Sequence, residues 1–130
     1  MAQRIAQAVS VFHENLTGHA PKSVTVVLSN NTLVITLHEA LSKAERVLAR
    51  NPAGAAQVQD FHRQLFNTAS QPLREEITQI TGVDVREAAA EIEPKSGAIV
   101  HAFTSGDMVQ VYLLTDPISE AVWNGAGYSI

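Results

Sequence analysis

Residues 24–37 read VTVVLSNNTLVITL, and this stretch decides the fold. Apolar side chains recur at every second position in both halves, and this period of two is typical of β-strands. The alternating positions are Val24, Val26, Leu28, Leu33, Ile35 and Leu37. Between the halves stands Asn30-Asn31, a pair that tolerates the positive φ of a tight turn. The stretch therefore predicts a β-hairpin.

The second face of this hairpin is also apolar, because Val27 and Val34 point away from the main set. An apolar sheet face is normally buried against another layer of structure. We therefore expect either helices on both sides of the sheet or a partner subunit on one side.

A helical pattern precedes the hairpin in residues 2–16, where apolar side chains lie three and four positions apart and form one face. Gly18 follows as a C-cap, and Pro21 prevents the helix from continuing. After the hairpin, the sequence from Ser42 to Glu45 is a capping box, in which each side chain bonds the other residue's backbone amide. It predicts a short helix over 43–50. The apolar residues that we expect this helix to bury are Ala44, Val47 and Leu48.

A longer helical pattern covers roughly residues 53–81. The residues that we expect on its buried face are Val58, Phe61, Leu65, Ala69, Leu73, Ile77 and Ile80. Pro72 lies inside the pattern, so we expect either a kink there or a fresh start capped by Ser70. Gly82 closes the pattern as the residue after the helix.

The remaining third of the chain is rich in strand signals. Residues 83–93 are predicted to be extended, because Gly82 and Pro94 bracket them, although 86–91 would also suit a helix. The runs 99–103 and 108–114 are further strand candidates. Asp116-Pro117 predicts a last short helix with Asp116 as its N-cap, and we expect the glycine-rich tail 124–130 to be loose.

The order of these elements is α-β-β-α-α-β-β-β-α. Because strands and helices are segregated along the chain, we predict an α+β fold. The expected architecture is a two-layer sandwich with a mostly antiparallel sheet of four to five strands and three main helices. At 130 residues, we expect one domain over residues 1–130.

Composition excludes several classes of function. Nine Lys and Arg residues are scattered singly in a chain of net charge −4, which argues against a nucleic-acid partner and against adhesion to anionic lipid. No apolar run is long enough to span a membrane, and residues 1–10 do not resemble a signal peptide. There is no cysteine, which suits a reducing compartment. We therefore expect a cytoplasmic protein without direct membrane insertion.

Motifs that carry chemistry are absent from the sequence. The five histidines include no pair at helical spacing and no HExxH motif, so we predict no metal site. There is no nucleophile elbow and no glycine-rich phosphate loop, so we predict no catalytic residue and no cofactor. The adjacent acids Glu75 and Glu76 are interpreted as a solvated helix face. Nothing here predicts an enzyme.

Four segments, taken in order, resemble the MpsC-like family of small bacterial proteins. They are Gly18-His19-Ala20-Pro21-Lys22, Ala40-Leu41-Ser42-Lys43-Ala44-Glu45, Arg63 with Pro72-Leu73-Arg74-Glu75-Glu76-Ile77 and Thr81-Gly82-Val83, and Lys95-Ser96-Gly97 with Val100 and Phe103. The resemblance covers about residues 3–104 and leaves 105–130 as a C-terminal extension. It implies a protein without catalysis of its own that accompanies a sodium-translocating, membrane-potential-generating system.

Two functions are favoured by these observations, ahead of a third, an enzyme of unrecognised class. The first is an accessory or regulatory protein that forms a homodimer and docks on a membrane transport complex, with the apolar hairpin and its open strand edge as pairing surfaces. The second is a small-ligand sensor that binds an anion or nucleotide. Its candidate binding residues are His19, Lys22, Arg63 and Arg74.

Overall fold

The computed structural model of the protein describes residues 1–93 and 106–124. The elements follow one another as α1 (Ala2–Thr17), β1 (Ser23–Ser29), β2 (Thr32–His38), α2 (Lys43–Leu48), α3 (Pro52–Ala69), α4 (Gln71–Thr81), β3 (Val85–Glu93), β4 (Asp107–Leu114) and α5 (Glu120–Trp123). The four strands form one sheet in the order β1-β2-β4-β3, and each neighbouring pair is antiparallel. The predicted α+β fold with an antiparallel sheet is confirmed.

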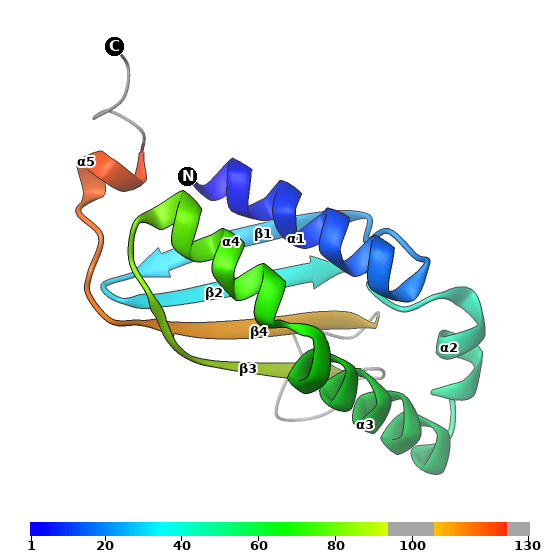
Figure 1. Ribbon diagram of the computed structural model, residues 1–130. Coiled ribbons are helices and arrows are strands. Elements are labelled where there is room, and N and C mark those ends of the chain that lie inside the picture. Colours follow the sequence, from blue (N-terminus) through cyan, green and yellow to red (C-terminus); the bar gives the residue numbers. More distant parts are fainter. Residues whose placement is uncertain (94–105, 125–130) are drawn as a thin grey trace.

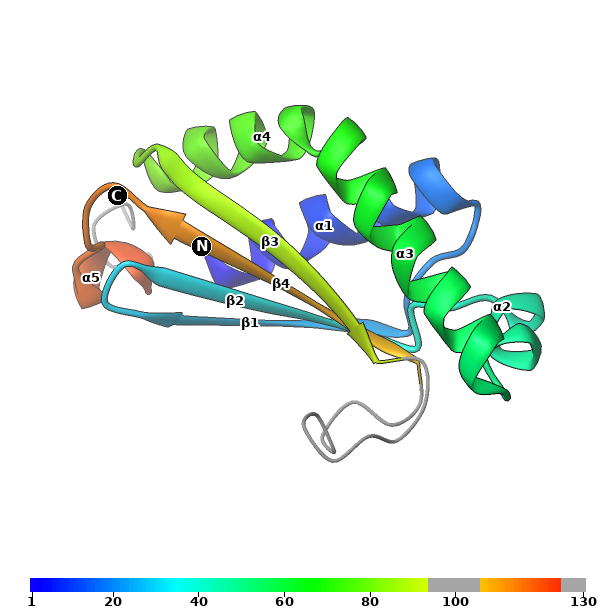
Figure 2. The same ribbon diagram turned by 90° about the horizontal axis from the view of Figure 1, so that it is seen from below.

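The three long helices lie on one face of the sheet (Figures 1 and 2). In the described part of the chain no helix covers the other face, so the expectation of helices on both sides is wrong. The core lies between the helical layer and the inner sheet face. Its most deeply buried side chains come from α1, β2, α4 and β4 and include Ile5, Val9, Leu33, Ile35, Leu37, Leu73, Ile77 and Tyr112.

The hairpin forms as its sequence predicts. Asn30 has a φ of 57°, the left-handed conformation that the tight turn requires. Val24 pairs with Leu37 and Val26 with Ile35, so the main apolar set of both strands points to the same face. Helix α1 ends at Gly18, whose φ of 79° is the left-handed conformation of a C-cap.

The long helical pattern is two helices, joined at Ser70. The predicted fresh start is therefore confirmed, but a side-chain cap by Ser70 is wrong. Ser70 has φ −81° and ψ −8°, a helical conformation, whereas a capping serine needs an extended one. Gly82 ends α4 with a φ of 75°, as expected.

The buried face of α3 is rotated from the predicted one. Val58, His62 and Phe66 are buried, whereas Phe61 is 55% exposed. Four-residue spacing makes these three buried residues neighbours along one side of the helix. Phe61 is more hydrophobic than His62, so the sequence pattern favours Phe61 for the buried face.

Helix α2 is shorter and less buried than predicted. Its capping box is present, but Ala44 is exposed, and Val47 and Leu48 are 47% and 45% exposed. The backbone of α2 instead touches the start of α3, because a Cβ added at Gly54 would lie 1.8 Å from the Leu48 carbonyl oxygen. Only glycine allows so close an approach.

The chain after residue 106 supplies an inner strand. β4 lies between β2 and β3, so it belongs to the sheet and is not a peripheral addition. The predicted strand at 99–103 and the tail 125–130 lie outside the described residues. The last helix begins at Glu120 with Ser119 as its side-chain cap, so the predicted start at Asp116-Pro117 is wrong.

Candidate functional site

Two of the four predicted ligand-binding residues meet at Glu39, which follows β2. The Nε2 atom of His19 lies 3.0 Å from the Glu39 carbonyl oxygen, and the Lys22 ammonium lies 3.4 Å from the Glu39 carboxylate. These contacts fasten the turn after α1 to the connection between β2 and α2. The positive charge of Lys22 is thus already beside a carboxylate.

The other two predicted residues lie on different helices. Arg63 is an exposed residue of α3. Arg74 is on α4, where it lines a pocket of about 550 Å³ together with Glu75, Asp84 and Val85. That pocket includes neither His19 nor Lys22. A single anion site built from all four residues stays a prediction.

A polar cluster that the sequence analysis missed lies inside the helical layer. We call His13, Glu45 and His62 the histidine cluster, and they come from α1, α2 and α3 respectively. His13 and His62 are each only 3% exposed, and their rings stack with centroids 6.1 Å apart. His62 Nε2 donates a hydrogen bond to the Glu45 carboxylate, and His13 Nε2 donates one to the carbonyl of Ala40 at 3.0 Å.

Glu45 holds this cluster and the start of α2 at the same time. One carboxylate oxygen accepts from the Ser42 backbone amide at 3.0 Å, and the other accepts from His62. Burial alone would raise the pKa of Glu45, but the hydrogen bonds from His62 and Ser42 hold it at about 2. A carboxylate that stays ionised at neutral pH is a poor general acid, and its accepting atoms are already used.

Burial lowers the pKa of His13 below the ordinary histidine value of 6.5. The bond to Ala40 and the charge of Glu45 act in the opposite direction, while His62 and His19 also lower the pKa. The folded chain therefore takes up the His13 proton at lower pH than the unfolded chain does. Stability contributed by neutral His13 is present above pH 6.5 and is lost as the pH falls below that value.

We expect acidification from about pH 7.5 to about pH 5.5 to lower the melting temperature, because the unfolded chain binds a proton that folded His13 does not. One proton corresponds to at most about 1.4 kcal/mol of unfolding free energy per pH unit. In His13→Gln an amide can still donate to the Ala40 carbonyl but cannot titrate, so its melting temperature should depend less on pH. Calorimetry of both proteins over this range measures the difference. Parallel pH profiles would contradict the assignment.

Metal binding finds no support among the residues that the structure describes. No group of three His, Asp or Glu side chains there is placed to hold an ion. The two histidines of the histidine cluster each direct Nε2 to a different acceptor, the Ala40 carbonyl and the Glu45 carboxylate. The cluster is thus a set of internal hydrogen bonds that joins three helices.

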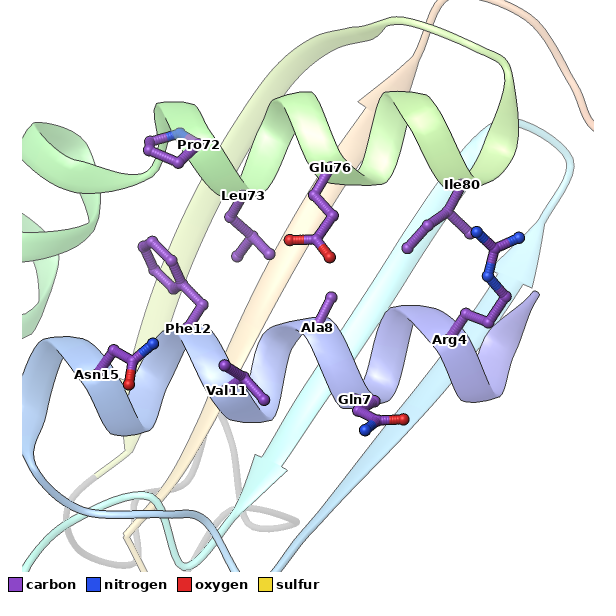
Figure 3. A pocket seen from close by; sticks show the side chains of 10 residues that line it. All are labelled: Arg4, Gln7, Ala8, Val11, Phe12, Asn15, Pro72, Leu73, Glu76 and Ile80. Carbon is purple, nitrogen blue, oxygen red and sulfur yellow. The ribbon is translucent and has the colours of Figure 1, made fainter.

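A groove of about 450 Å³ runs between α1 and α4. Figure 3 shows Phe12 of α1 and Leu73 of α4 pointing toward one another across it, with Arg4 at one end beside Ile80. Val11 also lines the groove and is 49% exposed. Apolar and charged groups therefore share this surface of the helical layer.

The opposite side of the molecule is the uncovered side of the sheet, which we call the outer sheet face. Burial alternates along β1, β2 and β4, and the less buried set forms this face. Its members on these strands, apart from the residues at one end, are Thr25, Val27, Ser29, Thr32, Val34, Thr36, Val109, Val111 and Leu113. None of these side chains is charged. On the edge strand β3 the register places Glu87, Glu91 and Glu93 opposite Leu113, Val109 and Asp107, so this face is uncharged over β1, β2 and most of β4 and acidic along β3.

A valine row crosses the middle of the outer sheet face. Val27 pairs with Val34 across β1 and β2, and Val34 pairs with Val111 across β2 and β4. Val27 is 53% exposed, the highest value among the apolar residues of the sheet that the structure describes. Both Val27 and Val34 were recognised in the sequence as pointing away from the core.

Within the described ranges, no helix is both long and apolar enough to cross a membrane. No curated protein and no solved structure matches the chain. The model of one protein family does match it, over residues 1–106. The family is described as the Na⁺-translocating membrane potential-generating system (MpsC), and the match covers most of the 130 residues. The resemblance found in the sequence is thereby confirmed, and the chain belongs to the MpsC family.

Proposed function

We propose that the protein is a non-enzymatic accessory or regulatory protein of a membrane ion-transport or energy-coupling system, and that it acts in the cytoplasm as a homodimer. The observation that carries this proposal is the family match over residues 1–106, since the family is named for a Na⁺-translocating system. A protein of this kind would influence the transporter by binding to it, without transforming a substrate.

The histidine cluster supports a role without catalysis. Its members are already engaged, because His13 and His62 bond to Ala40 and Glu45, and Glu45 bonds to Ser42. General acid–base catalysis needs a group within reach of a bound substrate. The cavity lined by His13 and His62 has a volume of only about 10 Å³, which is too small for a substrate. Glu45 also lines a pocket of about 470 Å³, but its two carboxylate oxygens already accept hydrogen bonds from Ser42 and His62.

Association with a membrane complex can be tested by affinity purification from gently solubilised membranes. We expect an integral membrane subunit of an ion transporter to co-elute with the tagged protein in a fixed ratio. The control is the same purification from cells that make the untagged protein. Equal recovery of membrane subunits from both preparations would refute the association.

A functional readout makes this test specific for transport. Cells that lack the protein should show a smaller Na⁺-dependent membrane potential, and the intact chain should restore it. The deletion strain could show an unchanged membrane potential although the tagged protein co-elutes with the transporter. The protein would then bind the complex without regulating it.

A further inference from the structure

We propose that the pocket where α1, α2 and α3 meet, which we call the three-helix pocket, binds a small organic amine. Glu45 would hold the ammonium group, and apolar side chains would cover the rest of the ligand. The pocket has a volume of about 470 Å³ and lies at the end of the molecule where α1 ends and α2 leads into α3 (Figure 1). This volume is within the range of small-molecule sites. The inference goes beyond the accessory role, because it gives the protein a ligand of its own.

The walls of the three-helix pocket are largely apolar. Leu16 comes from α1, Leu48 from α2, and Val58 and Phe61 from α3. Leu48 is 45% exposed and Phe61 is 55% exposed, so two large apolar side chains of the pocket are in contact with water. A ligand that covers them would remove apolar surface from water, which favours binding. The walls therefore suit a hydrocarbon chain or an aromatic ring.

Glu45 is the one charged residue in the lining, as far as the structure describes it. Hydrogen bonds from His62 and Ser42 hold its pKa at about 2, so its carboxylate is ionised at neutral pH. In the described part of the chain no lysine or arginine lies within ion-pair distance of it, and its neighbour Arg46 pairs with Glu39 instead. The pocket therefore contains a negative charge that no permanently charged cation of the described chain neutralises.

The Glu45 carboxylate has room for a further donor. Each of its oxygens accepts one hydrogen bond, from Ser42 or from His62, whereas a carboxylate offers about four acceptor positions in all. An ammonium group has three N–H donors and would use the positions that are left. The side chain is only 22% exposed, so water would screen this pair of charges less than it does at an open surface.

Phe61 adds an aromatic ring close to this carboxylate. Its ring contacts the His62 ring edge to face, with centroids 5.2 Å apart, and His62 in turn bonds to Glu45. The face of an aromatic ring attracts organic cations. A carboxylate and an aromatic ring in one pocket therefore favour an ammonium group over a neutral hydroxyl group of the same size.

A metal ion and an anion are the competing ligands. A hard metal ion prefers several oxygen ligands, but Glu45 supplies the one carboxylate that the described residues contribute to the pocket. An anion would be repelled by the same carboxylate. The anion-binding residues predicted from the sequence, His19, Lys22, Arg63 and Arg74, are not part of the lining. The three-helix pocket is thus a different site for a ligand of opposite charge.

The first experiment compares three probes with the same apolar body: phenylbutylamine, neutral phenylbutanol and anionic phenylbutyrate. Titration of the isotope-labelled protein, followed by NMR, measures the dissociation constant of each probe and identifies the amides that it perturbs. We expect the amine to bind with a dissociation constant on the order of millimolar, at least about 10-fold more tightly than the alcohol, because a charged hydrogen bond is stronger than a neutral one. Phenylbutyrate should not bind. The perturbed amides should include those of Thr17, Ser42 and Gln57, which line the pocket.

Two variants test the carboxylate. Glu45→Gln keeps an oxygen that can accept from His62 but removes the charge, so the preference for the amine over the alcohol should disappear. Gln57→Lys leaves Glu45 in place, and its ammonium group should compete with the amine for the carboxylate, with the same result. Gln57 is exposed, so this variant should fold even if Glu45→Gln does not. The matched control is Gln64→Lys, on the same helix but outside the pocket, where the introduced side chain can pair with Asp60 and all probes should bind as they do to wild type.

Three results would overturn the inference. No binding of the amine at about 20 mM would remove the site, since a ligand of this size should bind at that concentration. Equal affinities of wild type for the amine and the alcohol would show that the carboxylate is not recognised. Perturbed amides confined to another part of the molecule, such as the groove between α1 and α4, would place the ligand there. None of these results bears on co-elution with a transporter, so the accessory role is tested separately.

Discussion

A chain that ends at Gly106 will not fold, although it contains every residue that the family match covers. Strand β4 begins at Asp107 and lies between β2 and β3, so its loss leaves β3 without any neighbour in the sheet. The truncation also removes Met108, Tyr112 and Leu114 from the core, where they are at most 4% exposed. Both the backbone hydrogen bonds of the sheet and its central packing are lost.

The expected loss exceeds the stability of a domain of this size. Truncating one large buried aromatic residue such as Tyr112 costs about 3–5 kcal/mol, and whole domains are stable by only about 5–15 kcal/mol. Circular dichroism on heating should show no cooperative transition for residues 1–106. The control is a chain that ends at Asn124, which keeps β4 and α5 and should melt near the wild-type temperature. A sigmoidal melt of the shorter chain would show that β4 is dispensable.

The elements that could be predicted from the sequence are those in which local pattern and tertiary burial agree. In the hairpin, the apolar period of two that includes Val26 and Ile35, a turn at Asn30 and burial against helices all favour the same structure. β3 was predicted from its bracketing by Gly82 and Pro94, although residues 86–91 have helical propensity. There, pairing with β4 overrides the local preference.

The histidine cluster could not be predicted, because its stability depends on residues far apart in the chain. His62 can be buried on α3 only because Glu45, 17 positions earlier, offers a carboxylate to its ring nitrogen. Hydropathy alone ranks Phe61 above His62 for a buried position. The spacing of Val58, His62 and Phe66 was the one available signal, and it requires counting a histidine as a core residue.

The contacts of the predicted ligand-binding residues also could not be predicted from the sequence. His19 and Lys22 are near in sequence, and both reach Glu39, which follows the second strand of the hairpin. A sequence does not reveal that the Glu39 carbonyl lies close enough to contact His19 and the Glu39 carboxylate close enough to contact Lys22. The second apolar face of the hairpin was predicted from Val27 and Val34, but the helices expected to cover it are absent from the described residues.

Glu45→Ala should lower the free energy of unfolding by about 2–4 kcal/mol at neutral pH, more than is usual for a glutamate on a short helix. Losing its half of the capping box accounts for about 1 kcal/mol, and leaving the buried His62 N–H without an acceptor costs a further amount of about 1–3 kcal/mol. The side chain is only 22% exposed, so water replaces it poorly as an acceptor for His62. Urea unfolding measures the loss.

Ser42→Ala is the matched control, because it removes the hydroxyl that caps the Glu45 amide and leaves the bond to His62 in place. It should cost about 1 kcal/mol. The difference between the two variants is then the contribution of the buried bond. Equal losses would mean that His62 gains nothing from Glu45.

The pH dependence of the Glu45 effect gives an independent check of its cause. The pKa of Glu45 is about 2 in the folded chain, below the ordinary value of 4.5, so the unfolded chain takes up the proton first as the pH falls. The stabilisation by Glu45 is therefore full above pH 4.5 and is lost as the pH falls toward 2. The difference in unfolding free energy between wild type and Glu45→Ala should stay constant from neutral pH down to pH 4.5 and should shrink below pH 4.5. A difference that already shrinks near neutral pH would place its origin in a histidine, because only the histidine side chains of this chain ordinarily titrate there.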